Sequence, residues 1–143
     1  MEDLTSDDIL ELHKTVETRF NVFQGVKDPG LVQAIADRPN QNLFGKFIPY
    51  DNIYAKAASI MEGIIRLHPF FDGNKRTALL AVTTYMEING YYMVLPLSAV
   101  RFTVMIAKTK TRDDKGNGKL IAKIAKWIEK LSDTDVDRIT KKH

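Results

Sequence analysis

The stretch from His68 to Thr77, HPFFDGNKRT, gathers titratable and phosphate-binding residue types within ten positions. A histidine titrates near neutral pH and can take a proton from a hydroxyl, so His68 is a candidate general base. Asp72 is a candidate Mg²⁺ ligand, because proteins hold this ion through one or two carboxylates together with phosphate oxygens. The combination points to transfer of a phosphate-containing group from a nucleotide to a hydroxyl.

A phosphate-binding cradle is predicted directly after Asp72, where the chain enters a helix. The first N–H groups of a helix have no partner within it, and the helix dipole favours an anion there. Glycine lets the anion approach the backbone, while lysine and arginine add positive charge. Each residue alone is more often a cap or a solvated side chain, but the combination favours chemistry. The predicted cradle consists of Gly73, Asn74, Lys75 and Arg76.

Helical spacing of apolar residues dominates the chain and predicts an all-α fold. Thr5 and Asp8 form a capping-box pattern before the first expected helix, and Asp28 is an expected cap before Pro29. Arg38-Pro39-Asn40 is expected to end this second helix. Asp51 is the expected cap of a third helix that reaches Leu67, and a buried central helix is expected from about Lys75 to Ile88. Phe70 is expected to anchor the loop between these two helices as structural support.

The second half of the chain has weaker signals. Asn89-Gly90 is expected to stop the central helix, and Tyr91 to Leu95 form a short extended run. Helices are expected at about 98–109 and 119–131. Gly116-Asn117-Gly118 is interpreted as a solvated turn between them, and the tail DTDVDRITKKH is expected to fray. Residues 40–50 suit a small β-hairpin or an apolar flap.

Length and composition limit the classes of protein. The 143 residues fit a single domain, 1–143, and the absence of cysteine excludes disulfides and thiolate chemistry. We find no signal peptide and no apolar run long enough to span a membrane, so we expect a cytoplasmic protein. The net charge of +3 is mild. Nucleic-acid binding is not expected, because the basic residues form no single stripe and the aromatic residues do not interleave with them.

The stretch resembles the signature of the Fic/Doc family, in which a histidine is followed at fixed positions by phenylalanine, an acid, a small residue, asparagine, glycine or lysine, and arginine. Here these positions are His68, Phe70, Asp72, Gly73, Asn74, Lys75 and Arg76. Three features favour the Doc (death-on-curing) toxin branch. Lys75 stands where the Fic branch has glycine, and Leu79 stands where many Fic proteins have a second arginine. Residues 28–38, with Leu12-His13 before them, also resemble the Doc N-terminal region.

The resemblance implies a compact α-helical bundle with the motif loop between two core helices, and transfer from ATP to a hydroxyl of a target protein. His68 would be the general base, Asp72 would hold Mg²⁺, and Asn74, Lys75 and Arg76 would bind phosphates. A flap would align the target segment as an added strand. The residues in the position of this flap are Leu43, Phe44, Gly45, Lys46 and Phe47.

Three alternatives for function stay open at this point. Lys75 and Leu79 favour Doc-like phosphorylation of a Ser, Thr or Tyr hydroxyl, with a translation elongation factor as the target associated with the Doc branch. Fic-like transfer of AMP is the first alternative. A nucleotide-binding module without turnover is the second, against which the intact His68 argues.

The self-inhibitory motif of many Fic proteins is absent. The segment Ser59 to Gly63 is one residue short of it, and the segment from Thr83 ends in Ile88 instead of glycine or asparagine. An antitoxin acting in trans is therefore expected. The other two histidines, His13 and His143, are expected to be structural or disordered instead of catalytic.

Overall fold

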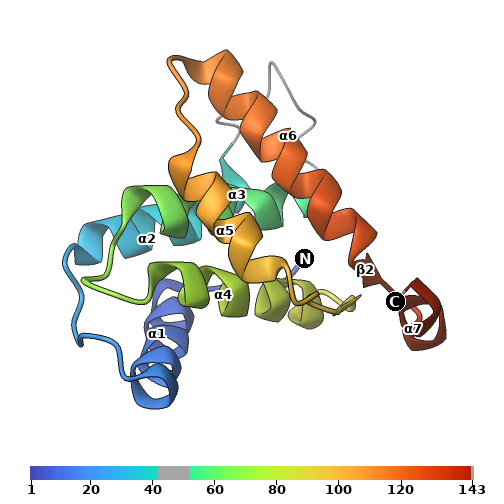
Figure 1. The fold of residues 1–143 in the computed structure, drawn as a ribbon, viewed down its shortest axis with the longest axis horizontal. Coiled ribbons are helices and arrows are strands. Elements are labelled where there is room, and N and C mark those ends of the chain that lie inside the picture. Colours follow the sequence, from blue (N-terminus) through green and yellow to red (C-terminus); the bar gives the residue numbers. More distant parts are fainter. Residues whose placement is uncertain (42–51, 143) are drawn as a thin grey trace.

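The computed structural model describes residues 1–41 and 52–142 (Figure 1). The fold is all-α, as predicted, with two strands of two residues each in the described part. The predicted flap, residues 43–47, lies outside the described residues. None of the helices in the described ranges is both long and apolar enough to cross a membrane.

The first two helices begin where the sequence predicts. Helix α1 (Ser6–Phe20) starts with a complete capping box, in which the Thr5 side chain accepts from the Asp8 N–H and the Asp8 carboxylate accepts from the Thr5 N–H. Helix α2 (Pro29–Asp37) is capped by the Asp28 side chain and continues into a 3₁₀ turn, η1 (Arg38–Asn40). Both predicted starts are confirmed. They could be predicted because a cap involves residues only a few positions apart in the sequence.

Helices α3 (Ile53–Leu67) and α4 (Asn74–Ile88) form the centre of the fold (Figure 1). They run antiparallel, with α6 against α3 and α1 against α4, and the predicted catalytic loop joins them. Asp51 was the predicted cap of α3, but the observed N-cap is Asn52, whose side chain accepts from the Tyr54 N–H. Asp51 lies outside the described residues.

The C-terminal half departs most from the prediction. Helix α5 (Ala99–Lys108) agrees, but α6 (Asp114–Lys130) begins five residues earlier than expected, because the Asp113 side chain caps it by accepting from the Gly116 N–H. The interpretation of residues 116–118 as a solvated turn is therefore wrong, and Gly118 is buried. The earlier start adds Lys115 to four lysines of the predicted helix, and together these exposed lysines follow one face of α6, so the expectation of no basic stripe is wrong for this helix. They are Lys115, Lys119, Lys123, Lys126 and Lys130.

The tail is ordered by contacts that the sequence did not indicate. Strand β1 (Tyr92–Met93) pairs antiparallel with β2 (Ser132–Asp133), and α7 (Val136–Lys142) follows. Ile139 of α7 is only 2 % exposed, so the expectation of a frayed tail is wrong. Pairing between segments forty residues apart depends on tertiary structure and not on local pattern.

Candidate active site

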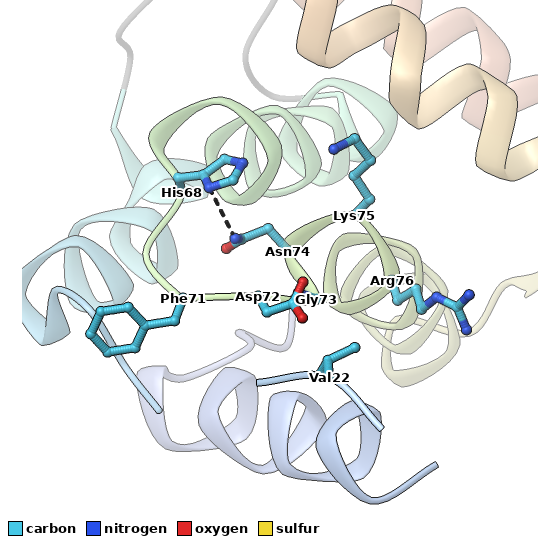
Figure 2. Close-up of a pocket in the computed structure, with 8 residues that line it drawn as sticks. All are labelled: Val22, His68, Phe71, Asp72, Gly73, Asn74, Lys75 and Arg76. Carbon is cyan, nitrogen blue, oxygen red and sulfur yellow. Dashed lines mark hydrogen bonds between the residues drawn. The ribbon is translucent and has the colours of Figure 1, made fainter. Parts of the chain in front are cut away.

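The loop between α3 and α4 and the start of α4 form a pocket of about 200 Å³ (Figure 2). All the residues predicted to act in catalysis, metal binding or phosphate binding lie around this one pocket. Val22 and Phe71 complete its lining; the predicted residues are His68, Asp72, Gly73, Asn74, Lys75 and Arg76.

His68 ends α3 in a left-handed conformation, with φ 56° and ψ 59°. This conformation is costly for a residue other than glycine, so surrounding contacts must hold it. Partial burial lowers the pKa of His68, and the charges of Lys27 and Lys75 lower it further. The imidazole is therefore neutral at physiological pH, which is the form that can accept a proton.

Asn74 is buried at the start of α4 and orients the His68 ring. Its Oδ1 accepts from the Phe70 N–H at 3.1 Å, and its Nδ2 donates to the Phe70 carbonyl at 3.0 Å. These two bonds fix which end of the amide is nitrogen. Nδ2 lies 3.2 Å from His68 Nδ1, so Nδ1 is the acceptor, and the proton of the neutral ring is on Nε2. The amide thus contacts the loop itself, while its predicted phosphate contact stays a prediction.

Asp72 is held with both carboxylate oxygens on backbone donors. Oδ2 accepts from the Phe23 N–H at 3.0 Å, and Oδ1 accepts from the Gly73 N–H at 2.9 Å. The bond from Phe23 and then that from Gly73 lower the pKa of Asp72. No group of three or more His, Cys, Asp or Glu gathers as a metal cage in the described ranges. A single ionised carboxylate beside a phosphate cradle instead fits Mg²⁺, which would take its other ligands from phosphates and water.

The start of α4 offers free donors to an anion. Gly73 stands at the N-cap with φ 77°, and no side chain caps the helix there. An added Cβ at Gly73 would lie 3.0 Å from Val16 Cγ1, so the backbone and its surroundings both require glycine. Lys75 lies at the pocket, while the guanidinium of Arg76 lies over the Phe20 ring at 4.0 Å and points away from His68 (Figure 2).

His13 of α1 supports the loop from below and was expected only to be structural. It is 2 % exposed; its Nε2 lies 2.8 Å from the Asp72 carbonyl oxygen, and its ring stacks on Phe70 with centroids 3.8 Å apart. Phe70 is completely buried. The sequence feature that could have indicated this supporting role is the position of His13, which shares the apolar face of α1 with Ile9 and Val16.

The connection between α1 and α2 also supports the catalytic loop, and the sequence analysis did not predict this. The Lys27 and Asp28 N–H groups donate to the Pro69 carbonyl at 2.8 and 3.0 Å. Val26 and Phe70 form an isolated antiparallel bridge. These bonds use the backbone, so the side chains of residues 26–28 did not reveal them.

The helical fold and this pocket define a class of protein. Residues 3–86 match the model of the Fic/DOC family, and this range contains the whole pocket. The chain belongs to the Fic/Doc family.

Two curated relatives are similar over the same part of the chain. "Toxin Doc" of Mycolicibacterium smegmatis is 34% identical over 88 residues, which are 62% of this chain and 67% of that protein. "Protein kinase doc" of Escherichia phage P1 is 28% identical over 90 residues, which are 63% of this chain and 70% of that protein.

Proposed function

We propose that this chain is a Doc-like phosphotransferase, which moves the γ-phosphoryl group of ATP to a Ser, Thr or Tyr hydroxyl of a target protein. One observation carries the proposal: a neutral histidine, an ionised carboxylate and the uncapped start of α4 share one pocket. Family membership supports a transferase, and the name of the phage P1 relative supports phosphorylation.

Each side chain has a proposed part in the transfer. The acceptor oxygen attacks the γ-phosphorus, the bond to the bridging β–γ oxygen breaks, and ADP leaves with that electron pair. His68 takes the hydroxyl proton. Lys75 and the N–H groups of the first turn of α4 hold the phosphate oxygens. When bound at Asp72, Mg²⁺ would neutralise phosphate charge.

Transfer of AMP is the second candidate, because the same cradle could present the α-phosphate. The acceptor would then displace pyrophosphate. Leu79 argues against this orientation, since it is 8 % exposed and places an apolar side chain where many Fic proteins have a second arginine. A nucleotide-binding module without turnover is the third candidate. The absence of any label transfer, together with nucleotide binding, would favour it.

We further propose a cytoplasmic toxin that an antitoxin restrains in trans. The name of the Mycolicibacterium relative supports the toxin role. Glu62, the acid in the incomplete inhibitory motif, lies between Arg38 Nη1 at 2.7 Å and Arg66 Nη1 at 3.3 Å. It is thus engaged inside the fold, which supports inhibition by another chain. A translation elongation factor is the proposed target.

Label transfer tests the reaction. The chain is incubated with Mg²⁺ and a cytosolic extract, with ATP labelled at either the α- or the γ-phosphate. We expect protein label from the γ-position only, and its loss in His68→Ala and on chelation of Mg²⁺. Label from the α-position would establish AMP transfer instead. No label from either, together with nucleotide binding, would establish the binding module.

A further inference from the structure

His68 also lines a second cavity. It measures about 590 Å³ and is formed by the C-terminal end of α3 and the connection between α5 and α6, which lie close together in Figure 1. His68 is the one residue in the described linings that belongs to both this cavity and the phosphate pocket. Its polar lining consists of Arg66, His68, Thr109, Lys110, Thr111 and Arg112.

Arg66 is fixed in this cavity by several partners. Its Nη2 donates to Thr111 Oγ1 at 3.0 Å, and its Nη1 lies 3.3 Å from both Glu62 Oε1 and Asn117 Oδ1. Asn117 is also bonded to Thr111. The Arg66 side chain is only 20 % exposed, so its guanidinium is held in place before any ligand arrives.

The cavity has a net positive charge. Glu62 is the one carboxylate beside Arg66 among the described ion pairs, and it also pairs with Arg38, so one negative charge serves two guanidinium groups. Lys110 and Arg112 are exposed and make no ion pair with any residue in the described ranges. Their acidic neighbour Asp113 is engaged as the cap of α6. No carboxylate lines the cavity itself.

We infer that this cavity binds acidic side chains, Asp or Glu, that flank the acceptor hydroxyl of the target protein. The inference rests on the proposed transferase function. The general base must lie within hydrogen-bond reach of the acceptor hydroxyl, whose oxygen attacks the phosphorus directly. His68 lines both the phosphate pocket and this cavity, so a target segment held in the cavity can place its hydroxyl beside the base. There, the fixed Arg66 and the free Lys110 and Arg112 attract carboxylates.

Binding of peptides without nucleotide tests the inference independently of the reaction. Three fluorescent peptides share a central Ser-Thr-Tyr segment and carry flanks of Asp/Glu, of Asn/Gln or of phosphoserine. Their affinities are measured at an ionic strength of about 0.15 M, where distant surface charges are screened. Wild type should bind the acidic peptide about tenfold more tightly than the neutral peptide.

The double variant Lys110→Ala/Arg112→Ala should lose this preference. Both side chains are exposed, so folding should be unaffected, and the melting temperature checks this. The matched control Lys126→Ala/Lys130→Ala removes the same charge from exposed positions on α6 that line neither cavity, and it should keep the preference. An equal loss in both variants would overturn the inference in favour of diffuse electrostatics. Equal binding of acidic and neutral peptides, or tighter binding of the phosphoserine peptide or of an RNA oligomer, would also overturn it.

A kinetic arm connects the cavity to turnover. With γ-labelled ATP, the Lys110→Ala/Arg112→Ala variant should raise the KM for the acidic peptide about tenfold and leave the KM for ATP unchanged. An increase in the KM for ATP instead would assign these cations to the nucleotide and overturn the inference. If wild type transfers no label, the proposed function fails while the binding arm still decides the inference.

Discussion

Replacing His13 by phenylalanine tests whether α1 positions Asp72. The change keeps an aromatic ring against Phe70 but removes the partner of the Asp72 carbonyl, which His13 Nε2 approaches to 2.8 Å. A partly buried carbonyl left without a donor costs up to about 1–3 kcal/mol. For a chain of this size, such a loss lowers the melting temperature by roughly 3–10 °C.

The same change should loosen the metal ligand. The Asp72 carboxylate depends on the Phe23 and Gly73 N–H groups, and the Gly73 N–H belongs to the same peptide group as the carbonyl that His13 holds. If the Asp72 carbonyl rotates to form a hydrogen bond with water, the Asp72 carboxylate moves away from these two donors. We expect His13→Phe to raise the Mg²⁺ concentration for half-maximal label transfer and to lower kcat by about tenfold, as small displacements in an active site do.

Two further variants separate positioning from stability. His13→Gln loses the stacked ring but keeps an N–H donor, so it should recover part of the Mg²⁺ affinity. Ile124→Val removes one buried methylene on α6, away from the loop, at a cost of about 0.5–1.5 kcal/mol. It should lower the melting temperature without changing the Mg²⁺ dependence. If His13→Phe also lowers only the melting temperature, His13 does not position Asp72 and the reasoning is refuted.

Three more outcomes are expected. Because burial and the charges of Lys27 and Lys75 lower the pKa of His68, the acid limb of the pH profile of kcat/KM should lie below the ordinary histidine pKa. Lys27→Met should move that limb to higher pH, and an unmoved limb would exclude His68 as the titrating base. Gly73→Ala should cost more stability than its control Gly90→Ala, because φ is positive at both positions but an added Cβ has neighbours only at Gly73; equal unfolding free energies would contradict this. Thr77→Val should raise the unfolding free energy by about 1 kcal/mol, since the Thr77 hydroxyl is buried with no hydrogen-bond partner in the described ranges, and a loss measured by denaturant titration would show that it has one.

The sequence predicted those parts of the fold that local interactions decide. The capping box of Thr5 and Asp8 and the cap at Asp28 involve residues within three positions, so their chemistry can be read directly. The start of α6 was missed although its cap, Asp113, is equally local. The glycines at 116 and 118 outweighed that signal, because glycine is unfavourable inside a helix. Burial of Gly118 in the packed structure overrides the unfavourable propensity.

The active site also has parts that the sequence could identify and parts that it could not. Its chemical groups are contiguous, so the stretch from His68 to Arg76 could be identified from residue types and spacing. The supports of these groups could not, because Val26, Lys27 and Asp28 act through the backbone and His13 acts from a helix fifty-nine positions before Asp72. Arg66 stands only two positions before His68, yet its contact to Thr111 depends on how α5 and α6 are joined.

The resting hydrogen bonds of His68 set a condition on the proposed chemistry. Asn74 directs an amide N–H at Nδ1, which places the proton of the neutral ring on Nε2. A base that accepts a hydroxyl proton at Nε2 needs the opposite tautomer, with the proton on Nδ1. Because Phe70 fixes both ends of the Asn74 amide, the amide cannot turn to accept that proton without losing two bonds. Proton transfer to Nε2 therefore requires the ring to turn away from Nδ2, and such a movement on substrate binding would restrict proton transfer to the assembled complex.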